Sequence, residues 1–284
     1  MTDSAFHFTI SLAQWSLNKA FFSKELDVLD FPRIARERYD IGAVEYVNQF
    51  FIDKALDKDF LQQLKANAEA VNVKNLLIMI DHEGELASAD SALRCQAIED
   101  HKKWIDAAAF LGCDAVRVNL HGMVTEAEWI HGSIESLTAL GNYARRVGLN
   151  VLVENHGGLS AKINLLIDVI RAVNLSNVGT MPDFGNFCIR REVPGDLWKS
   201  ACIEHYDPYR GVAEMLPYAG AISAKTYDIN AEGNEPTIDF ERMMAMIKSS
   251  GYQGYIGVEY EGERMSEDEG IRLSKTLLQR WQLA

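Results

Sequence analysis

The chain has 284 residues, of which 48% are hydrophobic and 24% are charged. This composition excludes fibrous, collagen-like and disordered proteins, and the length allows one large domain or two small ones. The 28 basic and 41 acidic residues give a net charge of -13. Because nucleic-acid binding depends on clustered cations, this charge argues against a DNA or RNA partner.

Short segments of β-strand composition recur along the chain about 35 residues apart. In chain order they are HFTISLA (7–13), GAVEYV (42–47), NLLIMI (75–80), AVRVNL (115–120), VLVEN (151–155), VGTMPD (178–183), AISAKT (221–226) and YIGVEY (255–260). Stretches of helical periodicity fill several intervals, at 60–71, 93–112, 137–148 and 165–173. Asp30 and Asp239 precede two further helical stretches as start signals.

This alternation predicts parallel βαβ units, and eight such units at this length match a (β/α)8 TIM barrel of the α/β class. A doubly wound open sheet is the alternative, but its GxGxxG turn follows none of the predicted strands. No Gly-, Ser- or Pro-rich linker divides the chain, so we expect a single domain over residues 1–284. The longest connection, 184–220, leaves the sixth strand, and we expect it to be functional or to contain extra short helices.

Four charged residues interrupt the apolar pattern of the fifth to eighth predicted strands. They are Glu154, Asp183, Lys225 and Glu259. Barrels carry their catalytic residues at the carboxyl ends of the strands, so we expect these groups to converge on one mouth with the two glutamates opposed. Burial of a carboxylate is costly unless a cation or several donors stabilise it. The group therefore suits either a divalent cation on oxygen ligands or a carboxylate pair acting as acid and base.

Structural interpretations stand beside these functional ones. The carboxylates could form an ion-pair network with Lys225 and Arg117 that closes the barrel mouth. Glu45, on the second strand, could equally be a structural partner for a neighbouring strand. Asp81, His82 and Glu83 are expected to belong to a solvated loop, DHEGELASADS (81–91), that caps the next helix.

Four strand-end segments resemble those of the sugar phosphate isomerase/epimerase superfamily of xylose isomerase-like TIM barrels. They are VLVENHGG (151–158), VGTMPDFGNF (178–187), AISAKTYD (221–228) and GYQGYIGVEYEG (251–262). The resemblance implies a metal held by Glu154, Asp183 and Glu259. A superfamily His on the seventh strand is Ser223 here, and a further His is replaced by Asn186. The remaining oxygen donors favour Mg²⁺, Mn²⁺ or Ca²⁺, with a metal-free site as the alternative.

The resemblance also implies a reaction. Glu154 and Glu259 would be opposed acid and base in the isomerisation or epimerisation of a small sugar, ketose or inosose, through a metal-stabilised cis-enediolate. The substrate-binding residues it suggests are Lys225, His156, Arg117, His121, Asn186 and Trp15. A dehydratase that begins with the same proton abstraction is one alternative, and a non-catalytic sugar-binding barrel without its metal is another.

The four cysteines show no CxxC pair and no regular spacing, so we expect free buried thiols. They are Cys95, Cys113, Cys188 and Cys202. The first fifteen residues lack the pattern of a secretory signal, and no apolar run approaches the length of a membrane span. We therefore expect a cytoplasmic protein with a small sugar or polyol as its partner, no membrane partner, and homo-oligomerisation left open.

Overall fold

The computed structural model describes residues 6–196 and 198–282. Its main sheet contains eight strands, which are β1 (Thr9–Ala13), β2 (Ala43–Val47), β3 (Lys74–Met79), β4 (Ala115–Val118), β5 (Asn150–Glu154), β6 (Val178–Met181), β9 (Ile222–Thr226) and β10 (Tyr255–Tyr260). They pair in parallel in the order β6-β5-β4-β3-β2-β1-β10-β9. Each of these strands overlaps one of the predicted strand segments, so the predicted alternation of strands and helices is confirmed.

The two ends of this sheet lie side by side. Isolated parallel bridges join Thr180 to Ala219 and Asp183 to Ser223, which connects the β6 segment to the β9 segment. The closure is short compared with the four- and five-residue registers elsewhere in the sheet, such as β9 with β10. A closed parallel sheet is the arrangement of a TIM barrel.

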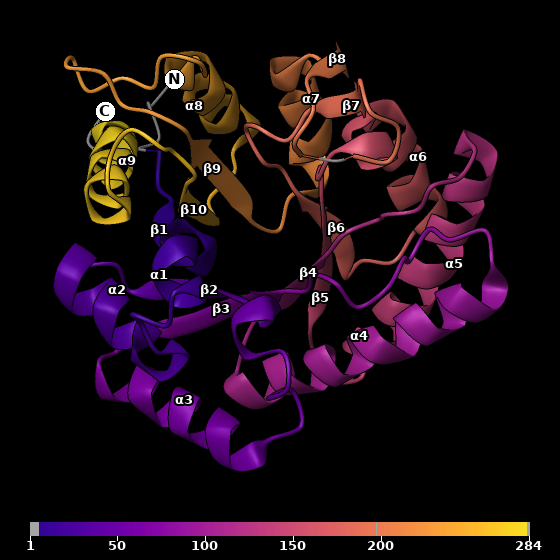
Figure 1. The fold of residues 1–284 in the computed structure, drawn as a ribbon, viewed down its shortest axis with the longest axis horizontal. Helices are drawn as coiled ribbons and strands as arrows, with labels where there is room; N and C mark the ends of the chain where they lie inside the picture. Colours follow the sequence, from indigo (N-terminus) through magenta and orange to yellow (C-terminus); the bar gives the residue numbers. More distant parts are fainter. Residues whose placement is uncertain (1–5, 197, 283–284) are drawn as a thin grey trace.

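Helices surround the sheet and cover its outer face (Figure 1). The longer ones are α2 (Phe31–Tyr39), α3 (Lys58–Ala70), α4 (Ser91–Leu111), α5 (Glu126–Arg145), α6 (Ile163–Val173), α7 (Pro208–Met215), α8 (Phe240–Ser250) and α9 (Glu267–Gln282). Short helical segments follow several strands: η1 (Gln14–Leu17), α1 (Asn18–Phe22), η2 (Val28–Asp30), η3 (Asn48–Phe51), η4 (Gly158–Ala161) and η5 (Leu216–Tyr218). None of the helices in the described ranges is long and apolar enough to cross a membrane.

The helices begin and end at recognisable sequence signals. Asp239 accepts the backbone N–H of Arg242 at the start of α8, and Gly251 ends that helix at a φ of 76°. Helix α5 begins at Glu126, well before the predicted 137, because Thr125 and Glu128 form a capping box. In its first half the buried residues are Trp129, Gly132 and Ser133, so the apolar periodicity is clear only in the second half.

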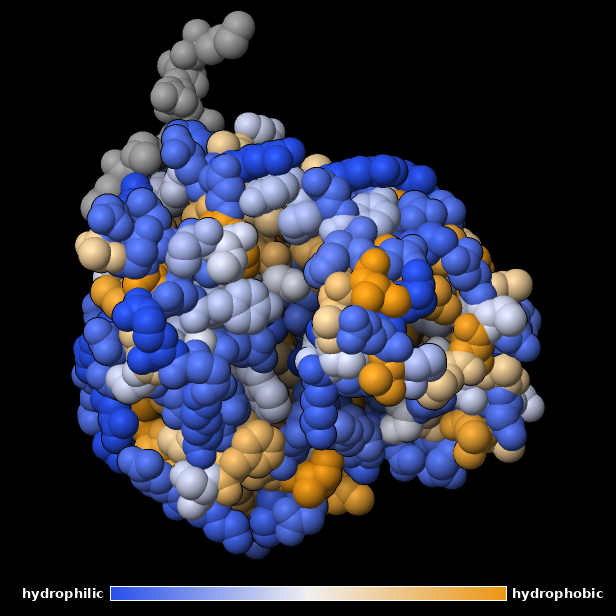
Figure 2. Space-filling model, turned by 45° about the horizontal axis from the view of Figure 1, so that its top comes forward, coloured by the Kyte–Doolittle hydropathy of each residue, from blue (hydrophilic) through white to orange (hydrophobic). Residues whose placement is uncertain are grey.

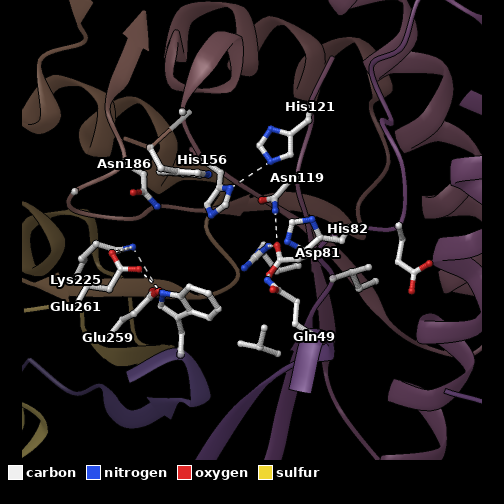
Figure 3. Close-up of a pocket in the computed structure, with 18 of the residues that line it drawn as sticks. Gln49, Asp81, His82, Asn119, His121, His156, Asn186, Lys225, Glu259 and Glu261 are labelled. Atoms are coloured by element: carbon white, nitrogen blue, oxygen red, sulfur yellow. Dashed lines mark hydrogen bonds and ion pairs between the residues drawn. The ribbon is translucent and has the colours of Figure 1, made fainter. Parts of the chain in front are cut away.

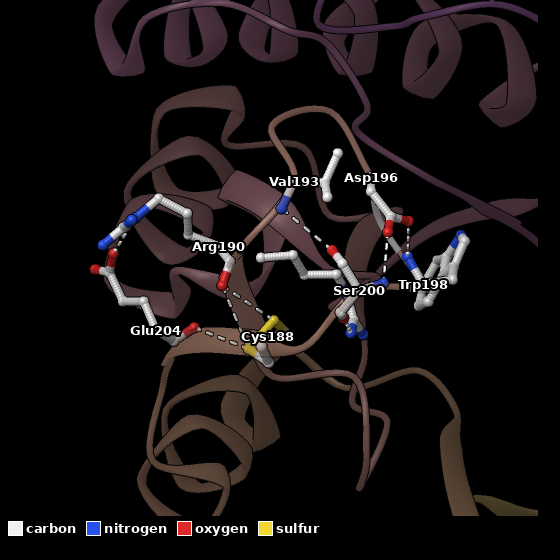
Figure 4. Close-up of a disulfide and its surroundings, with 9 residues drawn as sticks. Cys188, Arg190, Val193, Asp196, Trp198, Ser200 and Glu204 are labelled. Carbon is white, nitrogen blue, oxygen red and sulfur yellow. Dashed lines mark hydrogen bonds and ion pairs between the residues drawn. A yellow bond between two sulfur atoms is a disulfide. The ribbon is translucent and has the colours of Figure 1, made fainter.

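The connection 184–220 contains a feature that the sequence did not predict. Strands β7 (Cys188–Arg191) and β8 (Cys202–His205) form an antiparallel hairpin, closed by a disulfide between Cys188 and Cys202 (Figure 4). The prediction of free buried thiols is therefore wrong for these two cysteines. Cys95 and Cys113 are free, but only Cys113 is buried, whereas Cys95 is exposed. The Cα atoms of the two cysteines lie 5.9 Å apart, which is within the range of a disulfide, although the register pairs Cys188 with His205 and Cys202 with Arg191. No cysteine spacing in the sequence indicates this disulfide.

Reduction of this disulfide is expected to loosen the hairpin locally. Cross-linking a loop of this size stabilises it by about 3 kcal/mol in the chain-entropy account. A Cys188→Ser, Cys202→Ser double variant should therefore be cut by trypsin several times faster at Arg190, Arg191 or Lys199, as followed by mass spectrometry. Cys95→Ser is the matched control, since Cys95 is exposed and outside the hairpin. Equal cleavage rates in the two variants would contradict the expectation.

Candidate active site

A cavity of about 860 Å³ lies at the carboxyl ends of the strands. Its size falls within the range of about 300–1,000 Å³ that is usual for small-molecule sites. Its polar lining includes Asp81, Arg117, His156, Asn186, Lys225 and Glu259 (Figure 3). Figure 2 shows that one face of the molecule is hollowed between two raised parts of the surface. The location agrees with the rule that barrel sites form at this end of the strands.

Three buried carboxylates meet at one end of this cavity. Glu154 ends β5, Asp183 follows β6 and Glu259 lies in β10, and ligand atoms of all three lie within 4.8 Å of one another. Their exposed fractions are 2%, 0% and 5%. Glu259 lines the cavity, whereas Glu154 and Asp183 lie beneath its floor. The structure thus brings the three carboxylates together. Glu154 and Asp183 lie deeper than the barrel mouth, which is the position expected for them.

Ser223 of β9 lies between two of these carboxylates. Its Oγ is 2.7 Å from Asp183 Oδ2 and 2.5 Å from Glu259 Oε2. A hydroxyl carries one proton and can donate to only one of these oxygens. The second contact is therefore favourable only when a carboxyl proton or a cation lies among the oxygens. Because position 223 carries a serine and not a histidine, the side-chain atoms that could bind a cation here are all oxygens.

Lys225 pairs with the same acidic cluster. Its Nζ lies 3.0 Å from Glu261 Oε2, 3.4 Å from Glu259 Oε1 and 3.7 Å from Asp183 Oδ2. Burial opposes the charge of this amine, but the carboxylates outweigh burial and raise the pKa of Lys225 well above its ordinary value. Lys225 is therefore a charged, ion-pairing group rather than a neutral nucleophile.

Arg117 connects the carboxylate end of the cavity to its other end. Its Nη1 lies 2.6 Å from Asp81 Oδ1 and its Nε lies 2.8 Å from Glu154 Oε2. The Nε is buried and makes no aligned hydrogen bond in the described structure. Burial opposes ionisation of Asp81, but the charge of Arg117 outweighs it and holds the pKa of Asp81 below its ordinary range.

The expectation of a solvated loop at 81–83 is therefore wrong for two of its residues. Asp81 accepts hydrogen bonds from Asn119 at 2.6 Å and Gln49 at 3.1 Å. Glu83 is buried and accepts from the Trp104 indole at 2.6 Å. The predicted capping of the next helix is confirmed, because Asp90 of the same loop caps α4. A strand that ends at a barrel mouth delivers the residues just after it to the site, and Asp81 lies two positions after the end of β3.

The carboxylates at the Glu259 end hold their protons unusually tightly. Burial raises the pKa of Glu154 to about 7 against the opposing charge of Arg117, and raises the pKa of Asp183 to about 6 against that of Lys225. Burial also raises the pKa of Glu259. A divalent cation replaces such protons readily because it stabilises the ionised form. Three converging carboxylates with a hydroxyl beside them fit a hard, oxygen-preferring cation such as Mg²⁺ or Mn²⁺.

Two of the predicted substrate-binding residues support this end of the cavity. The Asn186 side chain donates to Glu154 Oε1 at 3.1 Å, and its backbone N–H donates to Asp183 Oδ1 at 2.8 Å. The Trp15 indole N–H donates to Glu261, and its ring stacks on Phe50. Asn186 thus orients two carboxylates, and Trp15 forms a cavity wall.

Two imidazoles lie at the other end. His156 Nδ1 is 3.4 Å from His121 Nε2, and the rings of Trp198 and His156 meet in a T-shaped arrangement with centroids 4.7 Å apart. Burial lowers the pKa of His121 to about 4 and lowers the pKa of His156 well below its ordinary value, with Arg117 adding to the effect on His156. Both rings are therefore neutral at pH 7.

Glu45 lies deeper in the barrel, where the Ser11 hydroxyl donates to its Oε1 at 2.5 Å and its Oε2 has no partner in the described structure. Burial raises its pKa to about 8 against that hydrogen bond. A carboxyl whose folded pKa is raised stabilises the protein fully below its unfolded pKa of about 4.5 and loses that contribution as pH rises through 8.

The Glu45→Gln variant is therefore expected to gain stability over the wild type as pH rises from 5 to 8.5, because Gln keeps the Ser11 contact and cannot ionise. Thermal unfolding at several pH values measures this difference. Glu69→Gln, at an exposed position on α3, is the control and should show no such trend. A difference between Glu45→Gln and wild type that is constant with pH would contradict the expectation.

Comparisons with known proteins agree with this architecture. The family described as xylose isomerase-like TIM barrel matches residues 35–281. The solved structure of IOLI protein with a bound zinc atom is 14% identical with a TM-score of 0.68, over 96% of this chain and 98% of that one. D-psicose 3-epimerase in the presence of D-fructose is 12% identical with a TM-score of 0.73, over 98% and 100%.

Two further comparisons differ in extent. The apo structure of 3-keto-D-glucoside 4-epimerase from E. coli is 16% identical with a TM-score of 0.69, over 96% of this chain and 99% of that one. A 54-residue segment is 35% identical to the C-glycoside deglycosidase alpha subunit of Arthrobacter globiformis. That alignment spans 19% of this chain and 15% of the relative's length.

Proposed function

Because the chain belongs to the xylose isomerase-like TIM barrel family, we propose that it is an isomerase or epimerase of a small sugar, ketose or inosose. The observation that carries the proposal is the convergence of three buried carboxylates beside a charged lysine at one end of the cavity. The likeness in fold to D-psicose 3-epimerase and 3-keto-D-glucoside 4-epimerase supports it.

Glu259 is the acid or base with direct access to the cavity. With its raised pKa it takes a proton from the carbon next to a sugar carbonyl. Glu154 returns a proton to the opposite face, or to the adjacent carbon, once substrate has displaced the Asn186 amide that covers it. Lys225 donates a hydrogen bond to the substrate oxygen on which negative charge develops.

Glu154, Asp183 and Glu259 would hold the divalent cation that the family implies. When bound, it supplies electrophilic stabilisation of the charge that develops on the sugar oxygens. The zinc atom in the IOLI structure supports a cation on this scaffold. Ser223 lies between Asp183 and Glu259, and its hydroxyl orients their carboxylates.

Hydrogen exchange in D₂O tests the proposal without knowledge of the final product. Purified protein with added Mg²⁺ or Mn²⁺ is incubated with a panel of ketoses, keto-glycosides and inososes, and deuterium incorporation next to the carbonyl is followed by NMR. Enzyme-dependent incorporation into at least one compound is expected. Incorporation together with loss of water from the sugar would assign a dehydratase instead. Binding without incorporation across the whole panel would overturn the enzyme and leave a sugar-binding barrel.

A further inference from the structure

The cavity has a second polar end that the carboxylate chemistry does not use. We call it the distal subsite and define it by Asn119, His121, His156 and Trp198. Asn119 is 6% exposed, and its Oδ1 has no hydrogen-bond partner in the described structure while its Nδ2 donates to Asp81. In Figure 3, Asn119 lies beside His121 and away from Lys225 and Glu259. A buried acceptor without a donor is costly, so this oxygen indicates a ligand hydroxyl or N–H.

The distal subsite differs in charge from the Glu259 end. The Asn119 amide and the two imidazoles of the distal subsite are hydrogen-bonding groups, whereas at the Glu259 end Lys225 lies among three carboxylates. The nearby Arg117 is already paired with Asp81 and Glu154, so its charge is balanced. An uncharged group with hydroxyl or ether oxygens suits this surface better than a phosphate or a carboxylate does.

The distal subsite also offers an aromatic surface. Trp198 is 48% exposed and lines the cavity, and its ring meets the His156 ring in a T-shaped arrangement. Ring systems stack on such surfaces, and the flat faces of sugars and aryl groups both do so. The total cavity volume of about 860 Å³ lies near the upper limit for drug-sized ligands and exceeds what a single sugar ring fills.

We propose that the substrate is an uncharged keto-glycoside, that is, a sugar that carries a ring carbonyl and is joined through its glycosidic oxygen to a second ring. The sugar that reacts lies against Lys225 and Glu259, and the second ring lies in the distal subsite against Trp198. Asn119 accepts a hydrogen bond from the sugar or its substituent. The assignment of the reacting sugar rests on the proposed function, whereas the distal subsite is argued independently from its own contacts.

The test compares two probes, methyl β-D-glucoside and phenyl β-D-glucoside, by titration calorimetry on the full chain with added Mg²⁺. The phenyl glycoside is expected to bind at least about tenfold more tightly, because stacking and apolar burial add to its affinity. In Trp198→Ala this ratio should fall below about threefold. Val193→Ala is the matched control, since Val193 lies on the same connection, is 56% exposed and does not line the cavity.

Equal affinities of the two probes for the wild type would overturn the distal subsite, as would failure of both to bind. A ratio that Trp198→Ala leaves unchanged would also overturn it, because the second ring would then lie elsewhere. The exchange experiment with free ketoses separates this outcome from the proposed function. A phenyl preference without any exchange retains the subsite and rejects the isomerase, and exchange without the preference does the reverse.

Discussion

The Glu259→Gln variant is expected to exchange the proton next to a ketose carbonyl about a thousandfold more slowly than the wild type. Glu259 lines the cavity, lies 3.4 Å from Lys225 and has a raised pKa, so it is the proton carrier with direct access to substrate. Gln has the same shape and can accept the Ser223 hydrogen bond, but it cannot take up a proton. The rate of deuterium incorporation measured by NMR gives the size of the loss.

Glu261→Gln is the matched control for this experiment. Glu261 follows the same strand, lines the cavity and pairs with Lys225, but it does not belong to the group of converging carboxylates. Its replacement should slow exchange less than about tenfold, within the cost of weakening one hydrogen bond to Lys225. Thermal unfolding of both variants checks that the fold is intact. A Glu259→Gln enzyme as active as the wild type would eliminate the carboxylate-pair mechanism.

One equivalent of Mn²⁺ or Mg²⁺ is expected to bind to the wild type, and Asp183→Asn should weaken this binding by more than a hundredfold. Asp183 is fully buried between Ser223 and the backbone N–H groups of Gly185 and Asn186, so its carboxylate is fixed in position. Losing an outer-shell partner of a metal ligand already costs about 10–100-fold in affinity, and loss of a charged ligand exceeds that. Titration calorimetry after chelator dialysis measures both proteins.

Asp228→Asn is the control for the cation experiment. Asp228 is also a carboxylate near the end of β9, but it pairs with Arg264 at the surface and takes no part in the buried group. Its replacement should leave the stoichiometry and affinity for the cation unchanged. Equal affinities of Asp183→Asn and wild type would mean that the cation binds elsewhere.

The strands and most helices could be predicted because their burial follows a local pattern. Each strand is largely apolar and several intervals have helical periodicity, so the order of elements indicates the barrel without knowledge of any contact. The converging carboxylates could be predicted from the sequence for the same reason, since a charged residue inside an apolar strand is unusual wherever it occurs. Glu154 and Glu259 are examples of this signal.

The remaining part of the site depends on contacts between distant segments. Asp81 follows an apolar strand in an acidic segment and looks solvated until Arg117 and Asn119, which follow on the next strand, are placed against it. A signal was available, because Arg117 and Asn119 alternate within one short strand and so share a face. The disulfide had no such signal, since its hairpin lies in a connection without strand periodicity.

The short closure between β6 and β9 gives the buried carboxylates a second consequence. One of the two bridges across this seam is Asp183 with Ser223, and Glu154 and Glu259 lie on β5 and β10, the strands that flank it. A cation on these residues would tie both margins of the seam together, and at a hundred times its Kd it would stabilise the folded chain by about 2.7 kcal/mol. Site occupancy and closure of the sheet would then be thermodynamically linked. Removal of the cation by a chelator would then open the sheet locally along this seam. The backbone amides of the seam would exchange with solvent before those of the rest of the barrel.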